Sequence, residues 1–431
     1  MEINLSESSE QLSGHLSKQD KALLKSVNQC QDVMLKQVLD WAAVNSGSNN
    51  SAGLETMASL LIKAFSHLDA KVEAVQTDPI ETIDSAGKKT FFQSGPIISV
   101  RARPRAPTQI ILTGHYDTVF APGVFEKIKD VGDGKINGPG LADMKGGLCV
   151  MLTALSVFEQ GPLKDKLGYE IVLTPDEETG NFGSAEFLKA AAKRADIGLT
   201  FEPAMEDGGM VAARKGSAIF DIIIHGRASH AGRAPQEGRN AMSAAAQFVS
   251  AIEALTNKHE GVTFNVGKID GGGPVNIVPD LAIVRLGVRA PDNQAAQRAT
   301  EQVHSLFETV CKRDGISGRV RGGFYRPPKP RNAAQDFLIS QVSATAGAMG
   351  LSLSFADTGG VCEGNNVFAA GTPNIDTLGV RGGRIHSNDE FIIVESLSER
   401  AGLTGLILNR LADGRIAGKA IKALMDNKHG T

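Results

Sequence analysis

Short apolar segments alternate with longer amphipathic ones from about residue 97 onward. Nearly all-apolar segments of strand length occur at 97–104, 108–117, 169–177 and 196–203. Segments with apolar residues at helical spacing lie at 146–160 and 183–195. Such strands between helices are typical of a mainly parallel sheet that helices cover on both faces. We therefore expect an α/β domain here, preceded by helical segments at 23–44 and 54–68.

The order of predicted strands and helices changes between residues 214 and 326. The pattern there predicts strand, helix, two strands, helix and strand, at 217–226, 239–256, 262–270, 281–290, 293–313 and 317–325. This order forms a compact α+β unit of domain size. The α/β pattern then returns with helices at 334–350 and 396–412 around a strand at 372–380. We expect a main α/β domain in two segments, 1–213 and 327–431, with a smaller α+β domain inserted at 214–326.

Composition narrows the class of protein. A chain of 431 residues with 42% hydrophobic and 22% charged residues is ordinary for a soluble protein of two domains. The 45 basic and 48 acidic residues give a charge of −3, so no broad basic surface favours nucleic acid or anionic lipid. No signal peptide and no continuous 18-residue apolar run is evident. Four dispersed cysteines suggest thiols in a reducing compartment. We expect a cytoplasmic protein with no nucleic-acid or membrane partner.

Ionisable residues follow the predicted strands, where ligand sites of open α/β sheets lie. His115 and Asp117 end the second strand, on one face and roughly 6.7 Å apart. The other ionisable residues at strand ends or in the following loops are Asp143, Asp176, Glu177, Glu178, Glu202 and His386. Each has an ordinary explanation alone, as a satisfied histidine, a helix cap or an exposed acidic turn. Together, so many carboxylates at one edge would repel one another unless a cation lay among them.

Imidazole with carboxylate favours zinc, whereas calcium and magnesium prefer oxygen ligands alone. One hypothesis places two zinc ions around Asp143. His115 and Glu202 would complete one site, and Glu178 and His386 would complete the other. Three carboxylates and one hydroxide would balance the four positive charges. Such a pair acidifies water and polarises a carbonyl. Glu177 could then move the proton, and Asp117 could fix the ring of His115.

Five motifs carry a family resemblance. GHYDTV, GPGLADMKGG, DEETGNFGS, FEP and HSNDE occur in this order between residues 113 and 390. Together they resemble the M20 family of binuclear zinc metallopeptidases, especially the glutamate carboxypeptidases, with acetylornithine deacetylases and succinyl-diaminopimelate desuccinylases as relatives. The resemblance implies two Zn²⁺ per subunit, with Co²⁺ or Mn²⁺ possible. It implies the ligands His115, Asp143, Glu178, Glu202 and His386, with Glu177 as general acid/base and Asp117 in support.

The inserted domain lies where the family has its lid and dimerisation domain. There HGRASHAG resembles the segment whose histidine, here His230, reaches the active site of the partner subunit; an exposed loop histidine is the plain alternative. GGGPVNIVPD places Asn276 where the family has an asparagine near the substrate's carbonyl or carboxylate, although a turn residue would look the same. FYRPPKPRN places Arg326 where an arginine grips the terminal carboxylate of the substrate. A solvated strand end is the alternative for Arg326.

The chain departs from the family in one loop. Many members have GG-x-[ST]-D-G-N, whereas residues 359–365 read GGVCEGN, with Cys362 and Glu363 at the changed positions. Because this loop faces the substrate pocket in the family, we expect the departure to bear on specificity more than on chemistry.

These patterns together predict a hydrolase that cleaves an amide next to a carboxylate-bearing amino acid. Its substrates would be small N-acyl amino acids or short peptides, and it would act as a homodimer through the lid. An N-acyl amino acid deacylase such as an acetylornithine deacetylase is the nearest alternative. A catalytically silent dimeric scaffold is another, disfavoured by the complete ligand set. A two-metal phosphatase is disfavoured because no basic cluster lies near the ligands.

Overall fold

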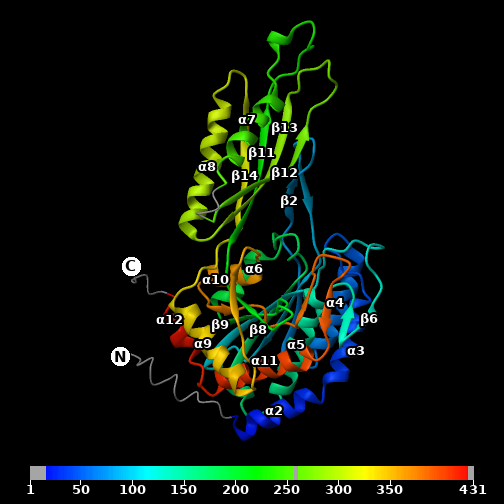
Figure 1. Cartoon of the computed structure of the whole chain (residues 1–431), viewed down its shortest axis with the longest axis vertical. Helices are drawn as coiled ribbons and strands as arrows, with labels where there is room; N and C mark the ends of the chain where they lie inside the picture. The colour runs from blue at the N-terminus through cyan, green and yellow to red at the C-terminus, as the bar shows by residue number, and fades with distance from the viewer. Residues whose placement is uncertain (1–15, 257–260, 426–431) are drawn as a thin grey trace.

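The computed structural model describes residues 16–256 and 261–425 of the chain. A large domain and a smaller one are stacked along the long axis (Figure 1). We call the smaller domain, residues 216–326, the lid. The large domain is built from the chain on both sides of it, and the two connections run side by side, since the main chains of Arg214 and Lys329 hydrogen-bond to each other.

A six-stranded sheet forms the centre of the large domain. In spatial order its strands are β1 (Lys71–Val75), β4 (Ile97–Ala102), β8 (Leu167–Thr174), β5 (Thr108–His115), β9 (Ile197–Thr200) and β16 (Asn374–Ile375). β4 pairs antiparallel with both of its neighbours, whereas β8, β5, β9 and β16 pair in parallel. Only β4 therefore runs against the rest, and the predicted mainly parallel sheet is confirmed.

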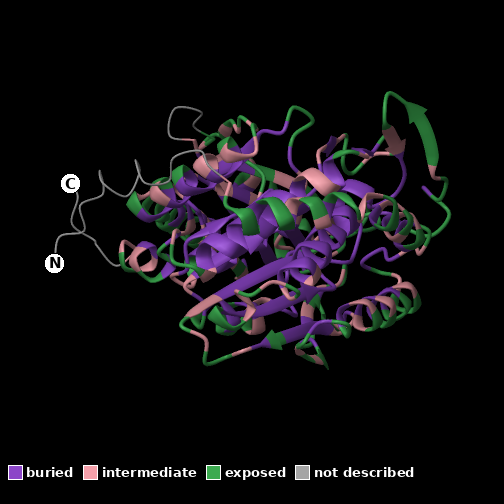
Figure 2. Ribbon diagram, turned by 90° about the horizontal axis from the view of Figure 1, so that it is seen from below, coloured by how far each residue is buried: buried purple, intermediate pink, exposed green. Residues whose placement is uncertain are grey.

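Helices cover both faces of this sheet, as predicted. The larger core holds α2 (Lys18–Asn28), α3 (Gln31–Ala42), α4 (Ser51–Phe65), α5 (Gly146–Phe158), α9 (Ala333–Ala348), α11 (Ser396–Ala412) and α12 (Gly418–Ala423). The opposite core holds α6 (Ala185–Lys193) and α10 (Glu363–Ala369). Along β5, Ile110 and Leu112 face the first core and Ile111 the second, as strand geometry requires. Figure 2 shows this buried interior inside a rim of exposed residues.

The helical segment predicted at 23–44 is helical but forms two helices, α2 and α3. Both pack against α5 and α11, so each buries its own apolar face. The π-helical turn η1 (Leu141–Lys145) leads into α5, and the stretch Leu141–Phe158 is long and apolar enough for a membrane span by length and composition. Because 89% of that stretch is buried inside the fold, it has the character of a core helix.

Small strand pairs border the large domain. A four-stranded sheet holds β17 (Gly382–Gly383), β18 (Phe391–Ile393), β7 (Lys135–Asn137) and β6 (Lys129–Gly132), and β10 (Met210–Arg214) pairs in parallel with β15 (Phe355–Thr358). The 3-10 turn η2 spans Lys164–Lys166. The small sheet matters for the site because β18 follows His386 and β7 precedes the loop that carries Asp143.

The lid has its own sheet and its own core. Its antiparallel strands lie in the order β12 (Thr263–Gly271), β13 (Leu281–Ala290), β11 (Gly216–His225) and β14 (Ser317–Arg326). The helices α7 (Ala241–Glu253) and α8 (Asn293–Cys311) pack on one face of this sheet. The 3-10 turn η3 (Pro235–Glu237) lies at the far end of the lid (Figure 1).

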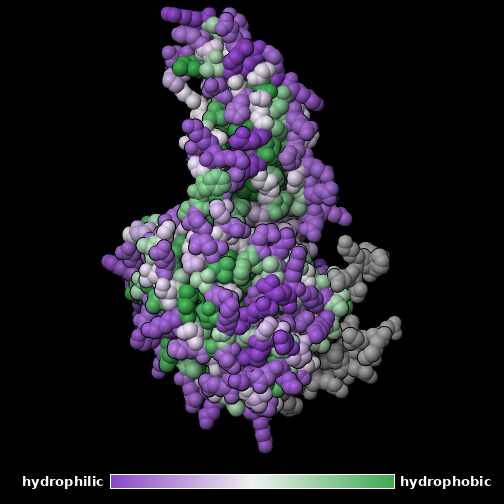
Figure 3. Space-filling view, turned by 180° about the vertical axis from the view of Figure 1, so that it is seen from behind, coloured by the Kyte–Doolittle hydropathy of each residue, from purple (hydrophilic) through white to green (hydrophobic). Residues whose placement is uncertain are grey.

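A hairpin from the first segment of the chain packs on the other face of the lid sheet. It consists of β2 (Ile80–Ile83) and β3 (Lys89–Phe92). Ile83 packs against Ile223 and Ile283, and Arg321 lies 3.0 Å from the carboxylate of Glu81. Its short, largely exposed strands gave no pattern from which to predict it. From behind, polar residues cover most of the visible surface and apolar ones gather along the middle of the lid (Figure 3).

Candidate metal centre

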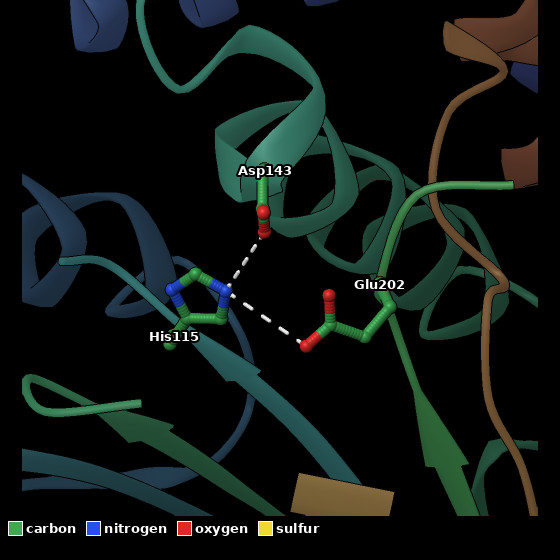
Figure 4. A group of neighbouring side chains, drawn as sticks. All are labelled: His115, Asp143 and Glu202. Carbon is green, nitrogen blue, oxygen red and sulfur yellow. Dashed lines mark hydrogen bonds and ion pairs between the residues drawn. The ribbon is translucent and has the colours of Figure 1, made fainter. Parts of the chain in front are cut away.

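His115 ends β5 with its ring fully buried at the carboxyl edge of the sheet. Nδ1 lies 3.0 Å from the main-chain oxygen of Asp117 and 3.4 Å from its carboxylate. Because a carbonyl oxygen only accepts, Nδ1 donates a proton to it, and Nε2 is left to face the other ligands. Nε2 lies 3.1 Å from Asp143 Oδ1 and 3.8 Å from Glu202 Oε1 (Figure 4).

Asp143 lies in η1, where its backbone leaves the helical conformation, with φ −113° and ψ 88°. Its second carboxylate oxygen lies 3.1 Å from Nε2 of His386. The two oxygens of one carboxylate therefore face two different histidines. The loop that presents Asp143 is held from beneath by Glu390, whose carboxylate accepts hydrogen bonds from the main-chain N–H groups of Asp143, Ala142 and Gly140 at 3.1, 2.8 and 3.2 Å.

The turn after β8 carries Glu177 and Glu178. Both main-chain N–H groups donate to the carboxylate of Asp117 at 3.1 Å, and Ser48 donates its hydroxyl to the same carboxylate at 2.8 Å. Asp117 thus fixes the acidic turn as well as the ring of His115. The side chain of Glu178 lies 3.2 Å from Nε2 of His386.

Glu202 follows β9 and faces Asp143 because α5 lies close to the end of that strand. A Cβ atom at Gly147 would collide with the carbonyl oxygen of Phe201. Glycine is therefore required where α5 meets the residue that follows β9, next to Glu202. Oε1 of Glu202 is buried and has no hydrogen-bond partner within residues 16–256 and 261–425, as expected for an atom that awaits a cation.

The donor atoms fall into two groups that share one residue. His115, Asp143 and Glu202 form one group, and Asp143, Glu178 and His386 form the other, with the donor atoms of each within 4.8 Å of one another. All five residues that the sequence singled out as ligands are thus brought together. A nitrogen and two carboxylates on each side suit Zn²⁺, Co²⁺ or Mn²⁺ better than calcium. The residues present fit a pair of divalent ions.

Burial and mutual repulsion perturb these groups strongly. Burial raises the pKa of Glu178 to about 8 and that of Glu202 well above its usual value, and the charge of Asp143 adds to both. Hydrogen bonds to Asp143 and Glu178 raise the pKa of His386 to about 10. Burial opposes a charge on His115, but Asp117 and Asp143 outweigh it and hold its pKa well above its usual value. The cluster without metal therefore retains protons that a cation would displace.

Arg326 reaches this centre from the last residue of β14. It is 4% exposed, and Nη2 lies 2.7 Å from Oε1 of Glu177 and 2.6 Å from Oδ1 of Asn181. The arginine predicted to hold a substrate carboxylate therefore holds the carboxylate of the predicted acid/base. Its Nε has no partner in the described part of the chain, so one donor remains to be satisfied.

His230 and Asn276 lie together on the lid, away from the metal cluster. The main-chain N–H of Ala231 donates to the carbonyl oxygen of Asn276 at 2.9 Å, and His230 pairs with Ile277 in an isolated bridge. Both side chains are exposed. Their segments, 226–240 and 271–280, form the end of the lid that points away from the large domain (Figure 1).

Sequence reasoning missed several buried residues around the centre. Glu390 belongs to the quoted HSNDE motif, yet nothing in the motif indicates that its carboxylate anchors the loop of Asp143. Glu363 accepts a hydrogen bond from Thr174, its other oxygen has no described partner, and burial raises its pKa to about 7. Asp376 is paired with both connections to the lid, through Arg214 at 2.9 Å and Lys329 at 2.8 Å. Only the unusual loop at Cys362 and Glu363 gave a signal.

Comparisons with known proteins agree with this geometry. Residues 111–410 match the family described as peptidase family M20/M25/M40. Carboxypeptidase G2 of Pseudomonas sp. (strain RS-16) is 26% identical over 408 residues, covering 92% of this chain and 94% of that protein. Succinyl-diaminopimelate desuccinylase of Nitrosococcus oceani is 26% identical, covering 84% and 99%. The crystal structure of aminopeptidase PepT from Bacillus cereus superposes with a TM-score of 0.66 at 25% identity, covering 89% and 99%. The chain belongs to the peptidase family M20/M25/M40 and is a hydrolytic enzyme of that family.

Proposed function

We propose that the protein is a two-metal hydrolase that cleaves the amide bond joining an acyl group to an amino acid with a free carboxylate, in the manner of a glutamate carboxypeptidase. The observation that carries this proposal is the position of Asp143, whose two oxygens face His115 and His386 at 3.1 Å each. The similarity to carboxypeptidase G2 over 92% of the chain supports the choice of substrate class.

In this proposal His115, Asp143 and Glu202 hold one Zn²⁺, and Asp143, Glu178 and His386 hold the other. When bound, the two ions would polarise the amide carbonyl and acidify the attacking water. Glu177 accepts the proton of that water and delivers it to the leaving nitrogen, the task of a general acid/base. Asp117 keeps Glu177 in place through the hydrogen bond to its main-chain N–H, 3.1 Å long.

Arg326 binds the carboxylate of the leaving amino acid in this proposal. To do so, some of the N–H groups of its guanidinium must move from Glu177 to the substrate. Its Nε, which has no partner among the described residues, is one donor available for that purpose. Substrate binding would then release Glu177 for proton transfer. Closure of the lid over the site would exclude bulk water.

We also propose that the enzyme acts as a cytoplasmic homodimer. His230 and Asn276 are exposed together at the far end of the lid, where a second copy could receive them, and there His230 would stabilise the oxyanion and Asn276 would contact the substrate. Light scattering tests the dimer: a fully active monomer would exclude a role of His230 in a partner's site. The four free cysteines support the reducing location.

The proposal is tested by metal removal and by one substitution. Chelator-treated protein should be inactive on N-acyl amino acids and C-terminal glutamate peptides and should regain turnover with Zn²⁺, Co²⁺ or Mn²⁺. Glu177→Ala should keep its metal and lose about 10²- to 10⁴-fold in kcat, the usual contribution of a general acid/base. Glu186→Ala, at an exposed glutamate in the first turn of α6, is the matched control and should keep full activity. Substantial turnover by Glu177→Ala would refute its role.

A further inference from the structure

A cavity of about 370 Å³ lies beside the proposed metal centre, and no step described so far uses it. Its walls are formed by residues 47–50, residues 118–122, Glu178 and Thr179. We call it the Glu178 cavity. We propose that it is the subsite for the acyl part of the substrate and that it selects an acyl group without charge. This inference rests on the proposed function and names the substrate class of that site.

The position of the cavity follows from the two adjacent glutamates. Glu177 and Glu178 lie in the same turn but have different partners. Glu177 pairs with Arg326, 2.7 Å away, and Glu178 lines the cavity and lies 3.2 Å from His386. If the leaving amino acid lies at Arg326 and Glu177, then the acyl side of the scissile amide extends past Glu178. The Glu178 cavity adjoins this residue and is the space available to the acyl group.

The walls of the cavity are neutral apart from Glu178. Val119, Phe120, Ala121 and Pro122 supply an apolar wall, and Ser48, Asn49, Asn50, Thr118 and Thr179 supply neutral polar groups. Glu178 is the one ionisable side chain among the lining residues, and its carboxylate is already paired with His386. No lysine or arginine lines the cavity in the described part of the chain.

Charged acyl groups would therefore be penalised. A succinyl carboxylate would lose water without gaining a cationic partner and would face the carboxylate of Glu178. The ammonium group of a peptide with a free amino terminus would find no carboxylate that is not already engaged. An uncharged aryl or alkyl acyl group meets neither penalty, and 370 Å³ exceeds the roughly 150 Å³ of a cavity that holds benzene.

Hydrogen bonds within the chain hold the walls in place. The main-chain N–H of Ser48 donates to the oxygen of Thr118, and that of Thr118 donates to the oxygen of Ser46, both at 3.0 Å. The hydroxyl of Ser48 also donates to Asp117, at 2.8 Å. A cavity tied to the acidic turn in this way is pre-formed, so little ordering is needed when an acyl group enters.

The test keeps the leaving amino acid constant and varies the acyl group. Benzoyl-, succinyl- and glycyl-glutamate are compared on the zinc-loaded enzyme, and kcat/KM for benzoyl-glutamate should exceed each of the others at least tenfold. Val119→Lys places a cation in the cavity and should raise the succinyl to benzoyl ratio of kcat/KM at least tenfold, mainly through KM. Val33→Lys, at a valine of α3 that is 70% exposed and outside the cavity, is the matched control and should leave the ratio unchanged.

A binding measurement separates this inference from the proposed function. Calorimetry on Glu177→Gln should show benzoyl-glutamate binding more tightly than the other two compounds. Two results would overturn the neutral acyl subsite without affecting the proposed hydrolase activity. One is a preference of the wild type for the succinyl or glycyl compound. The other is the same succinyl to benzoyl ratio of kcat/KM in Val119→Lys and Val33→Lys. If none of the compounds is cleaved, preferential binding of the benzoyl compound still supports the subsite while the proposed function fails. If none is cleaved or bound, both are overturned.

Discussion

Arg326 and Glu177 are joined by an ion pair 2.7 Å long that connects the last strand of the lid to the acidic turn of the large domain. The pair is buried, since the two residues are 4% and 6% exposed. A carboxylate oxygen that accepts a hydrogen bond from a guanidinium is occupied until the guanidinium is drawn elsewhere. The proposed substrate carboxylate is the group that could draw it away, and this couples substrate binding to the release of Glu177.

The first prediction concerns Arg326. Arg326→Lys keeps the positive charge but loses the two-pronged donor geometry. KM for substrates with a free α-carboxylate should rise at least about tenfold, a loss of ~1.4 kcal/mol. The corresponding α-amides, which lack the carboxylate, should show no such change. Arg319→Lys, at an exposed arginine of the same strand, is the control. An equal effect on acids and amides would mean that Arg326 does not contact the substrate carboxylate.

The second prediction concerns metal content. Asp143 belongs to both donor groups, whereas His386 belongs to one. After dialysis, Asp143→Ala should retain almost no metal, and His386→Ala should retain about one ion per chain, because the site of His115 and Glu202 stays complete. Elemental analysis makes the comparison, with Asp133→Asn, at an exposed turn, as the control. Equal metal loss in the two alanine variants would contradict a shared Asp143.

The third prediction concerns pH and metal-free protein. The pKa values of Glu178 and His386 are raised to about 8 and about 10 from 4.5 and 6.5. A raised pKa in the folded state adds stability that is fully present below the unfolded pKa and is lost as pH rises through the folded one. The metal-free protein should therefore become less stable between pH 6 and pH 8.5, by about 3 °C in Tm or more.

Zinc should reverse that trend. The ligands must lose their protons to bind a cation, so the rise in Tm on adding Zn²⁺ should be larger at pH 8.5 than at pH 6. Differential scanning calorimetry with and without a chelator gives all four values. Two results would contradict a ligand cluster that holds protons in the absence of metal. One is a Tm of the metal-free protein that rises from pH 6 to pH 8.5. The other is a zinc-induced increase in Tm that becomes smaller over this range.

The fourth prediction concerns Glu390, which holds the loop of Asp143 through three main-chain N–H groups. Glu390→Gln replaces one acceptor oxygen by an amide donor that faces those N–H groups. Metal affinity should fall about 10- to 100-fold, as for other residues that orient metal ligands, and saturating metal should restore most of kcat. Titration with a chromophoric chelator measures the affinity. Asp389→Asn, at the exposed neighbouring residue, should bind metal normally. Normal affinity in Glu390→Gln would show that the loop does not need this anchor.

The sequence predicted the parts of the fold and of the candidate site that depend on local pattern. Apolar strands between helices imply a parallel sheet, and residues that follow such strands share one edge. That is why the sequence alone could place His115, Glu178 and Glu202 together, and why the motif around Asp143 could be joined to them. His386 was placed there too because it follows the strand predicted at 372–380, and the family resemblance then implied the same ligand.

The remaining features depend on tertiary contacts that local pattern does not encode. The strand order, the reversed β4 and the hairpin of β2 and β3 against the lid arise from pairing between distant segments. The same is true of Glu390 beneath the loop of Asp143 and of Arg326 against Glu177. The sequence shows that a residue carries a carboxylate or a guanidinium, but the partner of that group depends on the tertiary structure.

All of the proposed chemistry depends on Asp143 bridging two divalent ions, and anomalous diffraction from zinc-loaded crystals would show whether it does. We expect two anomalous peaks per chain, each about 2.0–2.2 Å from a different oxygen of Asp143, with His115 and Glu202 at one peak and Glu178 and His386 at the other. A single peak, or two peaks of which only one touches Asp143, would rule out the bridge.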